Sequence, residues 1–218
     1  MSGYESARTN MIERQLRPNN VTDERVIRAF AALRREQFVP EGIRAAAYAD
    51  TDLPLGGGRF LMAPMVAARL IQALEIARGD AALVVGAGVG YEAALIAQLA
   101  RTVIAVEEDA GLARLGREAL VEHRVANVKY VEGTAAQGSR VRPAYDAVLF
   151  GGAIAEIPED IVVQLAEGGR LAAVIRAGAG PGRATLATRT GGALAQRVMF
   201  DAATSTLPGF TRKPAFVF

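Results

Sequence analysis

The feature that most constrains the fold is a glycine-rich turn that directly follows a buried strand pattern. Residues 83–91 read Leu-Val-Val-Gly-Ala-Gly-Val-Gly-Tyr, so glycines stand at positions 86, 88 and 90. Glycine allows the backbone to turn sharply and lets a ligand approach without a Cβ atom in the way. Such a turn is typical of the carboxyl end of the first strand in an open parallel α/β sheet, where ligands bind. From the glycines alone, a tight strand-to-helix turn without a ligand is an equally good interpretation.

The spacing of the glycines narrows the kind of ligand. It is G-x-G-x-G and not the G-x-G-x-x-G of dinucleotide-binding folds, because position 91 is tyrosine. No Gly-Lys-Ser/Thr follows, which excludes a phosphate-binding P-loop. A nicotinamide-dependent dehydrogenase is therefore disfavoured.

An acidic residue strengthens the case for a ligand. Glu107 ends the next strand pattern, Thr102–Val106, where a carboxylate can accept both hydroxyls of a ribose. The alternative is a solvated turn in which Asp109 caps the following helix. We assign the cap to Asp109 and the ribose to Glu107. The turn and the acid together indicate a nucleoside ligand without a pyrophosphate, a description that S-adenosylmethionine fits.

Strand and helix patterns alternate on both sides of the turn. Strands are predicted at Ala81–Val85, Thr102–Val106, Val128–Val131, Tyr145–Phe150 and Arg170–Ile175, and helices at Pro64–Ile76, Tyr91–Ala100, Gly111–His123 and Pro158–Leu165. This alternation indicates βαβ units and a parallel sheet with helices on both faces. Thr185–Arg189 and Leu194–Phe200 lack a helix between them, so we expect them to pair antiparallel. The predicted fold class is α/β, a doubly wound, mostly parallel sheet of six or seven strands.

The N-terminal region has a different pattern. Ala7–Leu16 carries apolar residues near helical period, and a second helix is predicted from a cap at Thr22 or Asp23 to about Arg35. A loop is expected over residues 49–59. We expect one domain, in which residues 1–62 form a helical and loop cover and residues 63–218 form the core.

Composition excludes several classes of protein. The chain has no cysteine and one histidine, His123, so disulfides, thiolate chemistry and a metal site are not expected. Net charge is +2 with no run of like charge, which gives no indication of nucleic-acid binding. No apolar run reaches the roughly 18–20 residues of a membrane helix, and no secretory signal is visible. These features predict a cytoplasmic protein.

Short segments spread over nearly the whole chain carry a resemblance to one known family. They are Met11–Leu16, Arg35–Pro40, Ala47–Asp50, Leu53–Gly56, the glycine turn ending in Gly90-Tyr91, Val106-Glu107, Tyr145–Ala147, Ile157-Pro158 and Gln164–Leu171. In the order and spacing of these segments the sequence resembles the protein-L-isoaspartate O-methyltransferase family. The resemblance implies the seven-stranded class I methyltransferase fold with extra N-terminal helices, S-adenosylmethionine as cofactor, and methylation of the abnormal carboxylate of isoaspartyl residues in damaged proteins. It implies isoaspartyl peptides or proteins as substrate; we expect a monomer or homodimer.

The resemblance also implies roles for particular residues. The glycines at 86, 88 and 90 would lie under the methionine part of the cofactor, Glu107 would bind the ribose, and Leu53–Pro64 would form a wall between cofactor and substrate. The full set of implied cofactor-binding residues is Gly86, Ala87, Gly88, Gly90, Tyr91, Glu107, Glu108, Thr134 and Ala135. Tyr48 and Asp50 would help to close the site or anchor the loop.

The chain departs from the family pattern at the substrate motif. Where the family has Gly-Gln-Thr-Ile-Ser-x-Pro, residues 58–64 read Gly-Arg-Phe-Leu-Met-Ala-Pro. Phe60 and Met62 replace two hydroxyl side chains near the substrate carboxylate, and ordinary core packing is an alternative role for both. Arg59 can supply a new clamp for a carboxylate. Methyl transfer to an ionised carboxylate depends mainly on positioning, so these changes should affect substrate recognition first.

Two further departures concern the cofactor side. An acid that the family carries before the glycine turn falls at Val84, and the aspartate that meets the adenine amino group is replaced by Thr134.

Three hypotheses follow from the sequence. The chain is an isoaspartate-repair methyltransferase, a relative that methylates another acceptor, or a non-catalytic binding protein that kept the fold. Gly151-Gly152 would line the acceptor pocket with backbone, although a turn is the simpler interpretation, and the tail Pro214–Phe218 would add an edge strand or a partner contact.

Overall fold

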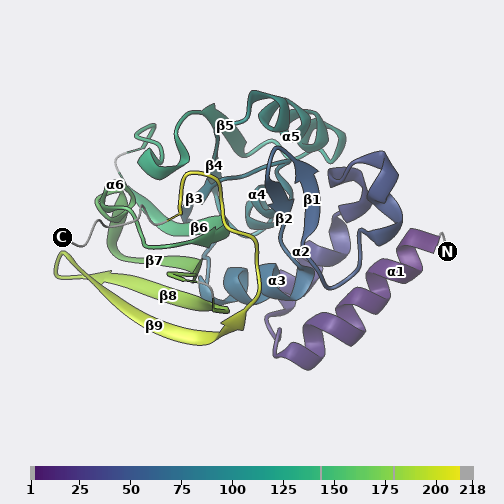
Figure 1. Ribbon diagram of the computed structural model, residues 1–218, viewed down its shortest axis with the longest axis horizontal. Helices are drawn as coiled ribbons and strands as arrows, with labels where there is room; N and C mark the ends of the chain where they lie inside the picture. Colours follow the sequence, from purple (N-terminus) through teal and green to yellow (C-terminus); the bar gives the residue numbers. More distant parts are fainter. Residues whose placement is uncertain (1–2, 143, 179, 212–218) are drawn as a thin grey trace.

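The computed structural model describes residues 3–142, 144–178 and 180–211. A seven-stranded sheet in the order β5-β4-β3-β6-β7-β8-β9 forms the centre of the molecule (Figure 1). Its strands are β3 (Ala81–Val85), β4 (Thr102–Glu107), β5 (Val128–Glu132), β6 (Tyr145–Ile154), β7 (Leu165–Ile175), β8 (Gly182–Thr190) and β9 (Ala193–Ala202). Strands β3 to β7 are parallel to one another, β8 is antiparallel to β7, and β9 is antiparallel to β8, which confirms the predicted α/β class.

Helices cover both faces of this sheet. The α-helices of the described residues are α1 (Gly3–Met11), α2 (Glu24–Ala32), α3 (Pro64–Ala73), α4 (Tyr91–Ala97), α5 (Ala110–Glu122) and α6 (Glu159–Val162). Successive residues of a strand point to opposite faces. Ala82 and Val84 of β3 accordingly pack into the core under α3 and α4, whereas Leu83 and Val85 pack into a second core that includes Ile161 of α6. Burial on both faces explains the uninterrupted apolar strand patterns.

The N-terminal helices pack beside α3 and α4. The first predicted helix is continuous, because α1 passes into a turn of π-helix over Ile12–Leu16. Asp23 caps α2 by accepting a hydrogen bond from the backbone N–H of Arg25, as its position predicts. Arg35, fully buried, donates hydrogen bonds to the carbonyls of Ala47 and Met62, at 2.7 Å each. This guanidinium ties the N-terminal cover to the segment that leads into α3.

The structure corrects several predicted elements. The helix predicted at Pro158–Leu165 spans only Glu159–Val162, because β7 begins at Leu165 and not at Arg170. The loop at 49–59 contains strand β1 (Leu53–Gly56), which pairs antiparallel with β2 (Arg59–Leu61). The helix predicted to reach Arg35 ends at Ala32, where Leu33 takes an extended conformation. Gly151-Gly152 lie inside β6 and do not form a turn. A Cβ atom at Gly151 would lie 2.2 Å from the carbonyl oxygen of Gly86, so a residue without a side chain is needed for this part of the strand to run there.

Candidate functional site

The glycine turn joins β3 to α4 at the carboxyl edge of the sheet. Gly86, Gly88 and Gly90 all have positive φ angles, of 70°, 54° and 85°. Residues that carry a side chain rarely adopt this left-handed backbone conformation, which explains the three glycines. The turn is fixed to the neighbouring strand because the N–H groups of Gly86 and Ala87 donate to the carbonyl of Val106, at 2.9 and 3.0 Å.

Glu107 lies directly beside this turn, as the strand order predicts. It is the last residue of β4 and is fully buried. Its Oε2 accepts a hydrogen bond of 2.6 Å from the N–H of Gly88. Its Oε1 accepts from the N–H groups of Glu108 and Asp109, at 3.0 and 3.1 Å. Backbone donors therefore orient the carboxylate at the carboxyl ends of two adjacent parallel strands.

Arg59 completes the surroundings of this carboxylate. It begins β2, and its Nη1 lies 2.7 Å from Oε1 of Glu107. Its Nη2 donates a 2.8 Å hydrogen bond to the carbonyl of Gly86. The side chains of Arg59 and Glu107 are 7% and 0% exposed, so the ion pair is almost completely shielded from water. Arg59 thus binds a carboxylate, but the carboxylate belongs to its own chain.

The other predicted cofactor residues are placed less uniformly. The ring of Tyr91 points into the core, where it packs edge-on against Phe30 and Phe38. Ala87 and Ala135 are buried, whereas the side chains of the two polar candidates, Glu108 and Thr134, are exposed.

The two apolar replacements in the substrate motif also differ from each other. Met62 is 1% exposed and belongs to the main core, whereas Phe60 is only half-buried, opposite Pro54 in the β1–β2 pair. Core packing, one of the two interpretations of these residues, therefore describes Met62. Val84, in place of the family's acid, is fully buried inside β3.

Two side chains at the turn have no signal in the sequence. Tyr130 of β5 donates from its hydroxyl to the carbonyl of Gly88 at 3.0 Å, and burial raises its pKa. Leu207 lies in the segment after β9, where a Cβ atom at Gly86 would meet its Cδ2 at 2.9 Å. Neither residue belongs to a motif, because each reaches the turn from a distant part of the chain.

Glu92, the second residue of α4, is a buried acid close to the glycine turn. It follows Tyr91 in α4 and is 3% exposed, and its Oε1 accepts no hydrogen bond within the described part of the chain. Burial raises the pKa of its carboxyl to about 7. The charge of Arg35 opposes this rise and the charge of Asp52 adds to it.

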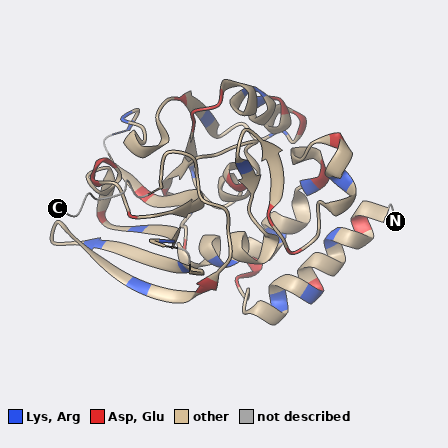
Figure 2. Cartoon of the chain, viewed as in Figure 1, with Lys and Arg blue, Asp and Glu red and all other residues tan. Residues whose placement is uncertain are grey.

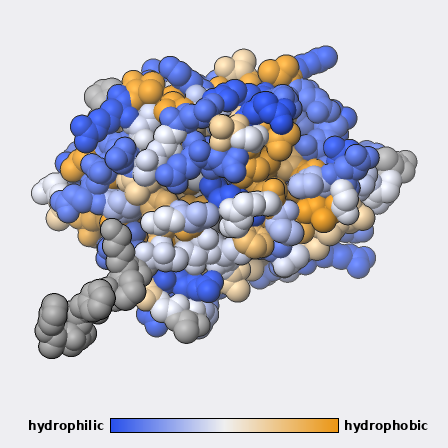
Figure 3. All heavy atoms as spheres, turned by 45° about the horizontal axis from the view of Figure 1, so that its top comes forward, coloured by the Kyte–Doolittle hydropathy of each residue, from blue (hydrophilic) through white to orange (hydrophobic). Residues whose placement is uncertain are grey.

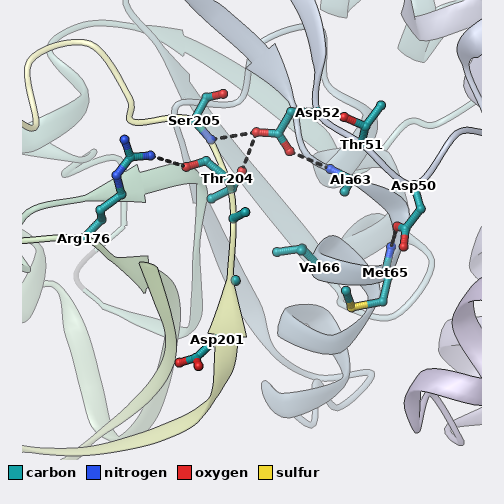
Figure 4. Close-up of a pocket in the computed structure, with 12 residues that line it drawn as sticks. Asp50, Thr51, Asp52, Ala63, Met65, Val66, Arg176, Asp201, Thr204 and Ser205 are labelled. Carbon is teal, nitrogen blue, oxygen red and sulfur yellow. Dashed lines mark hydrogen bonds between the residues drawn. The ribbon is translucent and has the colours of Figure 1, made fainter. Parts of the chain in front are cut away.

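A cavity of about 430 Å³ opens beside the segment that precedes α3 (Figure 4). Asp52 points between two parts of the chain that line it. One carboxylate oxygen accepts from the N–H of Ala63 at 2.9 Å, and the other accepts from the hydroxyl of Thr204 and the N–H of Ser205, at 2.8 and 2.7 Å. Leu53–Pro64 and its flanking residues therefore reach both the glycine turn, through Arg59, and this cavity.

The surface carries charges of both signs. Basic and acidic residues are interspersed over the chain (Figure 2), and hydrophobic residues lie between hydrophilic ones on the face that Figure 3 shows. Within the described ranges, no helix is long and apolar enough to cross a membrane. No group of three or more His, Cys, Asp or Glu side chains in the same ranges is arranged to hold a metal ion.

Comparison with known sequences points to the same family as the resemblance noted in the sequence. The family model for protein-L-isoaspartate(D-aspartate) O-methyltransferase matches residues 6–201. A protein-L-isoaspartate O-methyltransferase of Bordetella avium is 39% identical over 197 residues, which cover 89% of this chain and 74% of the relative. The enzyme of the same name from Koribacter versatilis is 37% identical over 171 residues, covering 78% and 77% of the two chains.

Solved structures show the same fold. One structure described as a protein-L-isoaspartate O-methyltransferase superposes with a TM-score of 0.81 at 22% identity, covering 94% of this chain and 67% of that chain. A second, described as the Plasmodium falciparum protein in complex with S-adenosyl-L-homocysteine, gives 0.76 at 22% identity, covering 95% and 99%. Both confirm the predicted sheet with its additional N-terminal helices.

Proposed function

Because the chain belongs to the protein-L-isoaspartate(D-aspartate) O-methyltransferase family, we propose that it methylates the abnormal carboxylate of isoaspartyl residues in damaged proteins. It is an S-adenosylmethionine-dependent methyltransferase that resembles the enzymes of this family. The family match over residues 6–201 carries the proposal, and it does not favour another acceptor or a non-catalytic role. The absence of cysteine is compatible with a reducing compartment, and we propose the cytoplasm.

The residues at the glycine turn fit this cofactor. The turn presents backbone without side chains at Gly86 and Gly88, and Glu107 beside it is a buried carboxylate, which can only accept hydrogen bonds. Ribose hydroxyls are donors of the matching kind. We assign Gly86–Gly90 to the methionine part, Glu107 to the ribose, and Thr134 and Ala135 to the adenine side. Tyr91 would contribute through its backbone alone, because its ring lies in the core.

Methyl transfer to a carboxylate needs little general acid or base catalysis. The cofactor supplies an electrophilic methyl group on a positively charged sulfur. The acceptor carboxylate is ionised near neutral pH, since ordinary side-chain carboxyls have pKa values of about 4. The protein's contribution is to hold the two reactants in line, which can account for a large part of a rate enhancement. We assign this positioning to Leu53–Pro64, which has Arg59 at the glycine turn and Ala63 at the 430 Å³ cavity.

The proposal is tested by binding and by methyl transfer. Calorimetric titration with S-adenosylhomocysteine should show binding, and an isoaspartyl peptide should accept a methyl group while the same peptide with ordinary aspartate should not. Glu107→Ala should weaken binding by about 10- to 100-fold for each ribose hydrogen bond lost. Glu132→Ala, at the end of the adjacent strand β5, is the matched control and should bind normally. Absence of both binding and methyl transfer in the wild-type chain would refute the proposal.

A further inference from the structure

The space above the glycine turn is filled by side chains of the chain itself. A Cβ atom at Gly86 would lie 2.9 Å from Leu207 and 3.2 Å from Nη2 of Arg59. A Cβ atom at Gly88 would lie 3.3 Å from Leu55 and 3.9 Å from the same Nη2. The glycines therefore make room for the protein's own residues in this structure, in the position that we assign to the methionine part of the cofactor.

Oxygen Oε1 of the Glu107 carboxylate has no free site left to accept a further hydrogen bond. A carboxylate offers about four lone-pair sites, two on each oxygen. Oε1 already has three donors, namely Arg59 and the N–H groups of Glu108 and Asp109. Asp109 is held at the start of α5, where it accepts hydrogen bonds from the N–H groups of Leu112 and Ala113, so the two backbone donors are less free to move than an arginine side chain. A ribose hydroxyl that binds Oε1 must therefore replace Arg59.

The local backbone allows Arg59 to leave. Gly56, Gly57 and Gly58 immediately precede it and all have positive φ angles, of 94°, 58° and 74°. All three are exposed, and glycine has more accessible backbone conformations than any other residue. Arg59 also makes an incomplete set of bonds, because its buried Nε has no hydrogen-bond partner within the described residues. Arg59 thus directly follows a turn of three glycines, and its guanidinium is held chiefly by Glu107 and the carbonyl of Gly86.

We propose that Arg59 is a built-in competitor of the cofactor, which holds the ribose-binding carboxylate of Glu107 in a closed state until the cofactor displaces it. The inference rests on the proposed function, since it takes Glu107 as the ribose acceptor. When a protein binds its ligand only in the open state, the apparent dissociation constant equals the intrinsic one divided by the fraction of molecules that are open. Arg59 therefore sets the cofactor concentration at which the site becomes loaded.

The test compares the affinity for S-adenosylhomocysteine of the wild-type chain and Arg59→Gln by calorimetry. Glutamine cannot form an ion pair, and Glu107 keeps its three backbone donors. We expect Arg59→Gln to bind at least about tenfold more tightly, as a closed fraction of 90% or more requires. Arg114→Gln is the matched control, since it makes the same change of charge in an exposed ion pair of α5 and should leave the affinity unchanged.

The outcomes separate this inference from the proposed function. Equal or weaker binding by a folded Arg59→Gln would overturn the inference, while measurable wild-type binding would leave the proposed function standing. Binding by Arg59→Gln alone would support the inference, and the proposed function would then stand or fall on methyl transfer by the wild-type chain. No binding by either chain would overturn both. Thermal unfolding of the ligand-free variants checks that each is folded. If Arg59→Gln does not fold, Arg59→Lys replaces it, because an ammonium cannot bridge Glu107 and Gly86 as the guanidinium fork does. Arg59→Lys should again bind S-adenosylhomocysteine more tightly than the wild type. Equal or weaker binding would overturn the inference.

Discussion

Replacing Glu92 by glutamine should remove a pH dependence from the stability of this fold. Burial raises the pKa of this carboxyl from 4.5 to about 7, against the opposing charges of Arg35 and Arg59 and with the support of Asp52. The pKa is higher in the folded chain than in the unfolded chain, so the folded state binds the proton more strongly. The stabilisation is therefore complete below pH 4.5 and is lost as the pH rises through about 7.

The size of the effect follows from the shift. One pKa unit corresponds to about 1.4 kcal/mol, so the shift from 4.5 to about 7 amounts to about 3 kcal/mol in total. Roughly 2 kcal/mol of this is lost between about pH 5.5 and about pH 8. The carboxamide of Glu92→Gln has nearly the shape of the protonated acid and does not titrate in this range. The variant should therefore become more stable than the wild type by a margin that grows by about 2 kcal/mol between these two pH values.

Urea unfolding followed by circular dichroism, at several pH values between these limits, measures this margin. Other titrating groups are common to both chains and cancel in the difference. Glu118→Gln serves as the control, because its side chain is 59% exposed in a surface pair with Arg114 and its margin should stay flat. A margin for Glu92→Gln that is constant within about 0.5 kcal/mol would show that Glu92 is ionised throughout, and the argument from burial would be wrong.

Two further substitutions test contacts around the site by urea unfolding. Asp52→Ala removes the three hydrogen bonds through which Asp52 joins the start of α3 to the segment after β9, and should lower the free energy of unfolding by about 1–3 kcal/mol. Asp50→Ala loses one bond of 3.3 Å and should lower it clearly less. Equal losses in the two variants would contradict the role assigned to Asp52. Gly151→Ala places a Cβ atom 2.2 Å from a backbone oxygen and should cost about 1–3 kcal/mol, whereas Gly42→Ala, with nothing within 4 Å, should be nearly neutral.

The central α/β units were predictable because their signals are local. Ala81–Val85 is a strand over the predicted range, since apolar residues on both faces match a strand covered on both sides. The position of Glu107 at the glycine turn followed from the same logic, because adjacent parallel strands end at one edge of the sheet. The family resemblance then supplied the cofactor and the reaction. The division at residues 62 and 63 stays a prediction, and Pro214–Phe218 lies outside the described residues.

Elements that depend on distant partners were not predictable from the same signals. Leu53–Gly56 contains proline and glycine, which disfavour a strand, and its pairing with Arg59–Leu61 is irregular. Gly151-Gly152 has the composition of a turn but continues β6, and Gly151 is needed there because the carbonyl of Gly86, directly after the neighbouring strand β3, comes close. In both cases the local preference points one way, and the neighbouring chain decides the outcome.

Arg59 illustrates how a motif position can act on a different part of the site from the one its alignment implies. The family carries a neutral glutamine there, within a substrate motif, so the sequence assigns the change to substrate recognition. The longer, charged side chain reaches Glu107 at 2.7 Å and Gly86 at 2.8 Å, both on the cofactor side. Its effect should therefore appear in the dissociation constant for S-adenosylhomocysteine rather than in the KM for an isoaspartyl peptide at saturating cofactor. A departure in a substrate motif then tunes how readily the cofactor loads.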